Sequence, residues 1–177
     1  MRQDYTARGA LLETDLAADW TAQFARWFAD ALEAGLPEPN AMIVATADPA
    51  ARPSARTVLL KGYYVRGFVF YTNYTSRKGT EALTNPYVSL VFPWFVMQRQ
   101  VIVAGPVERV TRAETEEYFA SRPRDSQLGA WASPQSQVVP DRAAVDAGYA
   151  AAVERFGDDD VPAPPHWGGL RVVPETV

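Results

Sequence analysis

The hydrophobic positions near the start of the chain recur every three or four residues, which is the spacing of one face of a helix. This pattern predicts a helix over residues 16–36, ended by Gly35, with Pro37 and Pro39 just beyond it. The apolar face of this helix consists of Leu16, Trp20, Phe24, Trp27, Phe28, Ala31 and Leu32. We interpret this aromatic stripe as core packing rather than as a ligand contact.

Runs of β-branched and aromatic residues through the middle of the chain predict strands. The expected strands are residues 41–46, 53–63, 68–72, 87–92 and 97–109. Residues 56–61 and 68–72 are expected to pair as a hairpin across a turn at 63–67. At least five strands in antiparallel succession, with few helices between them, favour a barrel or a sandwich over a βαβ fold.

Further helices are expected around these strands. One covers residues 77–84 and another covers residues 142–156. Between them, Thr111 and Glu114 have the spacing of a capping box and open a third helix. Residues 129–136 are rich in polar side chains and are expected to form a loop.

The composition narrows the class of protein. A chain of 177 residues with 47% hydrophobic content fits one domain with a sizeable core. It contains no cysteine, which excludes disulfides and thiolate metal sites and favours a reducing, cytoplasmic location. Neither a signal sequence nor a membrane-spanning run is apparent, so we expect a soluble protein whose residues 1–15 form a flexible arm.

One stretch has a charge opposite to that of the whole chain. The formal net charge is -4, which argues against a nucleic-acid partner. Residues 49–80 nevertheless carry six cations and no carboxylate, and they include both lysines of the protein. These cations are Arg52, Arg56, Lys61, Arg66, Arg77 and Lys78. The stretch predicts a site for a small anionic ligand, with an ordinary solvated basic face as the alternative.

The start of the helix at 77–84 has the features of a phosphate site. Thr75 or Ser76 is placed to cap the helix, and Arg77 and Lys78 follow directly. Free backbone N–H groups, the helix dipole and two cations at one helix start favour an anion. Upstream, strand alternation is expected to place Arg56 and Lys61 on opposite faces.

A second group of anion-binding side chains is expected near Pro123. Tyr118, Arg122 and Ser126 are each four residues apart and share one face if the helix continues or restarts past that proline. They form a second phosphate cradle, or else Tyr118 packs on Arg122 and Ser126 acts as a cap.

Two other polar residues leave the chemistry open. Gln100 stands among apolar strand neighbours, where its amide needs either a heterocycle or a strand edge as partner. His166 is the only histidine, and we interpret it as structural. Without a second histidine or a cysteine, neither a metal site nor a hydrolytic triad is expected.

Several segments together resemble the pyridoxine/pyridoxamine 5'-phosphate oxidase family, whose members depend on FMN. They span nearly the whole chain in the family's order. The matching segments are Arg56-Thr-Val-Leu-Leu-Lys61, Phe70-Tyr-Thr-Asn73, Ser76-Arg-Lys78, Asn85-Pro86, Phe92-Pro-Trp94, Arg99-Gln-Val101, Tyr118-Phe-Ala-Ser-Arg-Pro-Arg-Asp-Ser-Gln127, Gly129-Ala-Trp-Ala-Ser133, Gln135-Ser136 and Trp167-Gly-Gly169.

The resemblance implies a mainly β, α+β fold with peripheral helices: an antiparallel FMN-binding split β-barrel that forms a homodimer with FMN at the subunit interface. It implies flavin contacts from Arg56, Thr57, Val58, Leu59, Leu60, Lys61, Tyr71, Thr72, Arg77, Lys78, Gln100, Gln135 and Ser136. It implies contacts to the substrate from Arg2, Tyr5, Lys61, Tyr118, Arg122 and Ser126. FMN and a phosphorylated pyridine would then occupy the two anion sites.

The reaction implied by the resemblance is the oxidation of pyridoxamine or pyridoxine 5'-phosphate to pyridoxal 5'-phosphate. Oxygen is the acceptor, hydrogen peroxide is formed, and the amine also yields ammonia. The alternatives are a flavin or pyridoxal-phosphate binding module without turnover, or a split-barrel flavin oxidoreductase with another substrate. Family members continue past the segment that matches residues 171–177 into a last strand pair, with a Trp, an Arg and an Arg-x-His motif that have no counterpart in this sequence.

Overall fold

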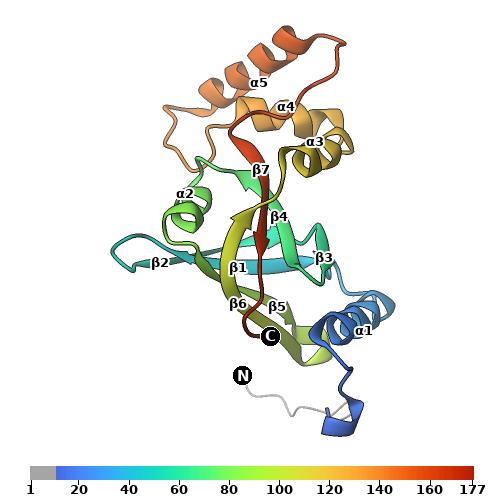
Figure 1. The fold of residues 1–177 in the computed structure, drawn as a ribbon. Helices are drawn as coiled ribbons and strands as arrows, with labels where there is room; N and C mark the ends of the chain where they lie inside the picture. The colour runs from blue at the N-terminus through green and yellow to red at the C-terminus, as the bar shows by residue number, and fades with distance from the viewer. Residues whose placement is uncertain (1–10) are drawn as a thin grey trace, which may run out of the picture.

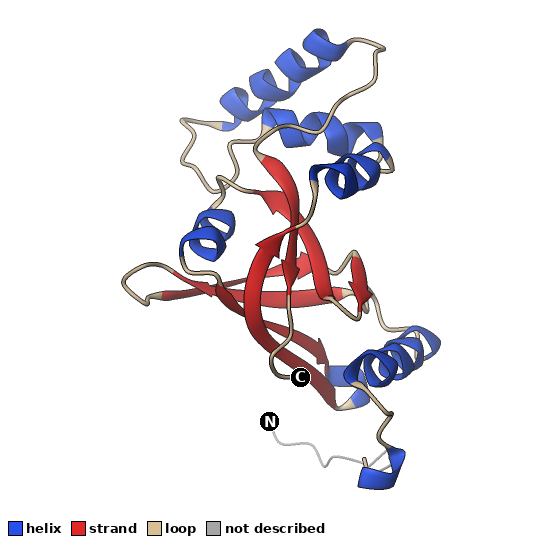
Figure 2. Ribbon diagram, in the orientation of Figure 1, coloured by secondary structure: helices blue, strands red, loops and turns tan. Residues whose placement is uncertain are grey.

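A seven-stranded antiparallel sheet forms the centre of the computed structural model, which describes residues 11–177 (Figures 1 and 2). Its strands are β1 Ala41–Ala47, β2 Pro53–Leu59, β3 Gly62–Tyr64, β4 Gly67–Asn73, β5 Tyr87–Trp94, β6 Arg99–Arg109 and β7 Trp167–Val172. They are hydrogen-bonded in the order β2-β1-β5-β6-β7-β4-β3. The antiparallel succession expected from the sequence is confirmed.

Helices gather at the two ends of this sheet, as Figure 1 shows. They are η1 Glu13–Asp15, α1 Trp20–Glu33, α2 Arg77–Thr84, η2 Phe95–Met97, α3 Arg112–Ala120, α4 Arg124–Ala132 and α5 Arg142–Phe156. Helix α1 lies at one end, while α3, α4 and α5 cluster at the other. The helices expected at 77–84 and 142–156 and the capping box at Thr111 are confirmed.

The first helix is shorter than its apolar pattern predicts. It begins at Trp20 because the side chain of Asp19 accepts a hydrogen bond from the amide of Ala22 and caps it. Gly35 follows its last turn with a φ of 67°, a conformation that suits glycine. Residues 13–15, expected to belong to a flexible arm, form the short helix η1.

The expected hairpin between residues 56–61 and 68–72 is wrong. Strand β2 pairs with β1 along its whole length, and β4 pairs with β3 and β7. The reason lies at Leu60 and Lys61, where the predicted second strand is interrupted. The amide of Leu60 donates to Asn40 beside β1, whereas the amide of Lys61 donates to Val69 in β4. The chain therefore crosses here from one half of the sheet to the other.

The carboxyl-terminal part of the sequence contains a strand that its pattern did not predict. Strand β7 is short and contains Gly168 and Gly169, yet all six of its residues are buried between β4 and β6. The loop expected at 129–136 is also corrected, because α4 runs on to Ala132. Helix α3 ends at Ala120, and Pro123 stands at the N-cap of α4. The helix therefore restarts past Pro123, which is one of the two arrangements that the predicted cradle required.

The aromatic stripe of α1 belongs to the core, as expected. The ring of Phe24 makes edge contacts with Phe68 and Phe92, with ring centroids 4.9 and 5.0 Å apart. A second apolar cluster joins α3, α4 and α5 to the start of β7 and contains Phe119, Leu128 and Trp167. The functional side chains described below lie where this second cluster meets β2, β4 and α2.

Candidate functional site

The N-terminus of α2 has the cap and the cation that the sequence predicts. The hydroxyl of Ser76 accepts a hydrogen bond from the amide of Gly79, so it is Ser76 that caps the helix. A Cβ at Gly79 would stand 2.6 Å from the carbonyl oxygens of Asn73 and Tyr74, so glycine permits this close approach. The ammonium of Lys78 donates to Thr72, Ser76 and Gln135, all of them neutral.

Carboxylates from outside residues 49–80 pair with the four arginines of that stretch. Asp48 binds Arg52 at 2.7 Å, and Glu108 binds Arg66 at 3.2 Å. Glu81 binds both Arg77, at 2.7 Å, and Arg56, at 3.6 Å. Within residues 11–177, neither Lys61 nor Lys78 forms an ion pair with a carboxylate. Each arginine is thus paired with a carboxylate, although Arg56 and Arg77 share one, whereas neither lysine is paired with any carboxylate in this part of the chain.

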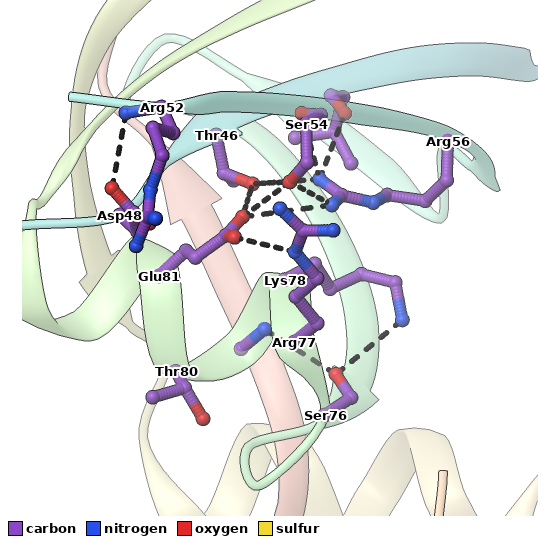
Figure 3. A network of polar contacts seen from close by, with 12 residues as sticks. Thr46, Asp48, Arg52, Ser54, Arg56, Ser76, Arg77, Lys78, Thr80 and Glu81 are labelled. Carbon is purple, nitrogen blue, oxygen red and sulfur yellow. Dashed lines mark hydrogen bonds and ion pairs between the residues drawn. The ribbon is translucent and has the colours of Figure 1, made fainter. Parts of the chain in front are cut away.

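Glu81 is the centre of the largest of these groups, which Figure 3 shows. Its Oε2 accepts hydrogen bonds of 2.5 Å from the hydroxyls of Thr46 and Ser54, and its Oε1 accepts one of 2.7 Å from Nε of Arg77. Burial of this carboxylate by itself would raise its pKa. The hydrogen bonds from Ser54, Thr46 and Arg77 outweigh burial and hold the pKa of Glu81 at about 2.

The predicted second cradle is also assembled. Tyr118 lies in the last turn of α3, Arg122 directly precedes Pro123, and Ser126 lies in the first turn of α4. The guanidinium of Arg122 stacks on the ring of Trp167, with its central carbon 4.6 Å from the ring centroid. Its Nη1 is buried and has no hydrogen-bond partner, and burial lowers the pKa of Arg122. A buried guanidinium with an unused donor is typical of a site that receives an anion.

Three parallel aromatic rings lie beside Arg122. Tyr71 and Tyr118 stack with ring centroids 3.9 Å apart, and Trp167 lies 5.4 Å from Tyr71. Burial, with smaller effects of nearby tyrosines and glutamates, raises the pKa of Tyr71 to about 12. Its protonated hydroxyl donates a hydrogen bond to the carbonyl of Glu114. These stacked rings place aromatic surface next to the cations.

Both predicted anion sites open into one cavity of about 500 Å³. Among residues 11–177, its lining contains three cations and no carboxylate. The lining residues are Thr57, Val58, Leu59, Lys61, Tyr71, Thr72, Asn73, Lys78, Tyr118, Ser121, Arg122, Pro123, Ser126, Gln135 and Trp167. Residues of both predicted cradles therefore line a single cavity, and we call it the cationic cavity.

Several predicted flavin contacts lie outside the cationic cavity. Arg56 and Arg77 are held by Glu81, and Leu60 is buried in the core. Ser136 is exposed with a φ of 68°, and Gln100 lines a separate groove beside α1. Arg2 and Tyr5 lie outside the described residues.

Sequence reasoning did not assign four lining residues to the site. Ser121 and Pro123 are chain neighbours of Arg122, so their adjacency was an available signal. Asn73 and Trp167 stand in segments that carry the family resemblance, but no strand was predicted at Trp167. Its place in the site depends on β7, which brings the carboxyl-terminal segment next to β4.

The comparisons with known proteins identify the family of the chain. Residues 28–152 match the family model described as pyridoxamine 5'-phosphate oxidase. The chain belongs to this oxidase family. It is 62% identical over 178 residues to the pyridoxine/pyridoxamine 5'-phosphate oxidase of Salinispora arenicola, covering 100% of this chain and 80% of that one. The same enzyme of Frankia alni is 60% identical, with 99% and 74% of the two chains covered.

Two solved structures share the fold. PhzG from Burkholderia lata 383, in complex with tetrahydrophenazine-1-carboxylic acid, has a TM-score of 0.86 and 28% identity, and the match covers 93% of this chain and 82% of that one. A pyridoxamine 5'-phosphate oxidase-related, FMN binding protein from Nostoc punctiforme has a TM-score of 0.69 and 17% identity, covering 90% and 82%. The expected split-barrel fold is thereby confirmed. Between residues 11 and 177, no helix combines the length and apolar character needed to cross a membrane.

Proposed function

We propose that this protein is an FMN-dependent oxidase that converts pyridoxamine or pyridoxine 5'-phosphate into pyridoxal 5'-phosphate, with oxygen as acceptor and hydrogen peroxide as product. The observation that carries the proposal is the cationic cavity, where Lys61, Lys78 and Arg122 face one space without a carboxylate. Cofactor and substrate both carry a phosphate in this reaction. The phosphates of cofactor and substrate would bind the three cations, which pair with no carboxylate among residues 11–177. The flavin and pyridine rings would lie beside the stacked aromatic side chains.

The residues divide between the two ligands by position. Lys78, with Thr72, Ser76 and Gln135 around its ammonium, supports the flavin phosphate at the start of α2. Lys61, Tyr118, Arg122 and Ser126 support the substrate phosphate, and the unused Nη1 of Arg122 is the donor that this phosphate would satisfy. Bound FMN supplies the hydride-accepting chemistry, so the chain's own task is to bind, orient and exclude water.

Two features of the proposal concern the assembly and its place in the cell. We propose a homodimer, because Gln100 lines a groove apart from Lys78, and a second copy would bring the two together. A cytoplasmic, single-domain enzyme of vitamin metabolism agrees with the absence of cysteine and with residues 11–177 building one continuous sheet.

A second candidate is a split-barrel flavin oxidase that acts on a different ring system. PhzG, with its tetrahydrophenazine-1-carboxylic acid, favours this alternative because it has the same fold and 28% identity. A carboxylate on that ligand would need one anion-binding group, whereas the substrate end of the cationic cavity supplies Lys61 and Arg122 together.

The test is an oxidase assay on protein loaded with FMN. Pyridoxine 5'-phosphate and pyridoxamine 5'-phosphate should each yield pyridoxal 5'-phosphate and an equal amount of peroxide, while unphosphorylated pyridoxine should react poorly. Turnover of tetrahydrophenazine-1-carboxylic acid but not of the vitamin phosphates would favour the second candidate. Flavin binding without peroxide from any of these substrates would favour a binding module.

A further inference from the structure

Glu81 lies outside the cationic cavity, yet it controls the charges next to it. Its side chain is almost fully buried, with 5% of the residue exposed, between α2 and the hairpin of β1 and β2 (Figure 3). Thr46 and Ser54 stand opposite each other in that hairpin, and both donate to the same carboxylate oxygen. A buried carboxylate with this many donors is fixed in one orientation.

The hydrogen atoms of this network can be counted. Each hydroxyl has a single proton, which Thr46 and Ser54 both give to Glu81, so no proton remains for the 3.3 Å contact between the two hydroxyls. Each hydroxyl acts as an acceptor toward Arg56, whose Nη1 donates to Thr46 and whose Nη2 donates to Ser54. Nη1 of Arg56 also donates to the carbonyls of Val44 and Ser54, and Glu81 adds to this support directly and through the two hydroxyls.

Arg77 is held in a different way. Its Nε donates to Glu81, but the structure shows no hydrogen bond from its two terminal nitrogens to any residue between 11 and 177. The side chain is 59% exposed, so without Glu81 it would be free to move into solvent. The bond at Nε leaves the terminal fork of the guanidinium available, which is the part that binds phosphate oxygens in a bidentate way.

The three cations at this end of α2 act on one another. The charge of Arg77 lowers the pKa of Arg56 after the larger effect of burial, and the charge of Arg56 likewise lowers the pKa of Lys78. Like charges at this range repel, and Glu81 offsets one of the three. The cluster that remains has two positive charges, which matches a phosphate monoester with about -1.5 to -2 at neutral pH.

We propose that Glu81 is a positioning residue for phosphate recognition: it holds Arg56 and Arg77 side by side, with the fork of Arg77 free, and so sets the preference for a phosphorylated flavin over an unphosphorylated one. The proposal rests on the FMN dependence proposed above. Glu81 itself touches no ligand in this assignment and acts through the two arginines.

The experiment measures dissociation constants of FMN and of riboflavin by quenching of flavin fluorescence, because these ligands differ only in the phosphate. Glu81→Met keeps the side-chain volume and removes the acceptor. It should weaken FMN by about tenfold, the size of one charge-assisted contact, and leave riboflavin unchanged. Glu81→Gln keeps an oxygen for Nε of Arg77 and should recover most of the FMN preference.

Arg77→Lys is the second variant. Because the side chain of residue 77 is largely exposed, this variant should fold even if Glu81→Met does not. A lysine ammonium keeps the charge but cannot bind Glu81 and present a fork at once, so the same loss of FMN preference is expected. Glu116→Met is the matched control, since Glu116 binds Arg112 four residues away, with the same 2.7 Å Nε–Oε1 distance, outside the cavity. It should change neither dissociation constant.

Each outcome separates this proposal from the one on which it rests. Wild-type protein that binds neither flavin overturns the FMN assignment itself. Wild-type protein that prefers FMN, with Glu81→Met equally selective, overturns only the role of Glu81. Tighter FMN binding in both Glu81 variants would mean that its charge repels the phosphate, and an equal loss of FMN and riboflavin would mean a purely structural role.

Discussion

At the scale of single residues, arginine and lysine have different roles in the basic stretch. The arginines at 52, 56, 66 and 77 pair with carboxylates, and a planar fork suits such fixed pairs. Neither lysine pairs with a carboxylate of the described part of the chain, and both line the cationic cavity. Burial lowers the pKa of Lys78, with a smaller contribution from the charge of Arg56. The charged ammonium is therefore destabilised in the unliganded site, and a bound anion would stabilise it.

Arg122→Ala should raise the KM for pyridoxine 5'-phosphate by about 10- to 100-fold, because it removes a charge-assisted contact worth about 1.5–3 kcal/mol. Flavin content should change little, since the proposed flavin phosphate contacts are Lys78 and its partners at the start of α2. Steady-state kinetics and the flavin absorbance of the purified protein measure the two effects. Arg124→Ala is the control, because Arg124 binds the carbonyls of Gly157 and Asp159 away from the cavity. Loss of FMN with an unchanged KM would mean that Arg122 binds the flavin phosphate rather than the substrate phosphate.

The depressed pKa of Glu81 predicts a dependence of stability on pH. Because its folded-state pKa is about 2, below the ordinary 4.5, the ionised carboxylate stabilises the fold above pH 4.5 and this contribution is lost as pH falls toward 2. Wild-type protein should therefore exceed Glu81→Gln in free energy of unfolding at neutral pH, and the gap should close in acid. Urea denaturation of both proteins at a series of pH values measures the gap. A gap that stays constant down to pH 2 would contradict the assignment.

At the scale of elements, a buried arginine joins α3 to the sheet through ion pairs. Arg171 of β7 is 2% exposed, and it binds Glu108 of β6 and Glu114 of α3, each at 2.7 Å. Glu114 also closes the capping box at Thr111. The first turn of α3 is thereby fixed relative to β7, and the same helix presents Tyr118 to the cavity.

Arg171→Met should lower the free energy of unfolding by about 3 kcal/mol, the low end for breaking a buried ion pair, because the two remaining carboxylates are near enough to the surface to regain water. The KM for the substrate should also rise as α3 loosens. Chemical denaturation measures the first effect. Arg142→Met removes an exposed helical pair with Asp146 and should cost less than about 0.5 kcal/mol. Equal losses in the two variants would mean that Arg171 contributes no more than a surface pair.

At the scale of the whole molecule, apolar surface remains beside the groove that contains Gln100. Phe95 is 82% exposed and Val96 70% exposed in the η2 turn, and Ile102 is 48% exposed two residues after Gln100. A groove of about 400 Å³ runs from Gln100 and Ile102 of β6 to Trp20 and Trp27 of α1. Exposed apolar surface of this kind is covered in many proteins by a second copy.

Mixing two weakly active variants tests whether residues of both copies contribute to one site. Lys78→Ala and Gln100→Ala should each be weakly active alone. If Lys78 of one copy and Gln100 of the other serve the same flavin, a mixed dimer contains one intact site and regains activity. Light scattering checks the dimer mass. Weak activity in the refolded mixture would mean that the two residues serve one site within a single chain or serve different sites.

The sequence by itself determined the elements and the chemistry that depend on near neighbours. The capping box at Thr111 appears in the structure where it was predicted, and Ser76 is the one of the two proposed residues that caps α2. The apolar period located the first helix but extended it beyond its observed ends at Trp20 and Glu33. The surplus of cations at 49–80 also predicted a site for a small anion, and this stays a prediction. The predicted helices and caps are confirmed because helix spacing and capping are properties of a few consecutive residues.

The tertiary structure decided what depends on distant partners. Strand pairing is non-local, so the sequence pattern assigned residues 56–61 to the wrong hairpin and did not reveal β7, whose glycines give no strand signal. Which cations remain unpaired was decided by carboxylates such as Glu108, which lies 42 residues from Arg66. Lys61, Lys78 and Arg122 share one cavity only because β7 and the restart of the helix at Pro123 bring three distant segments together.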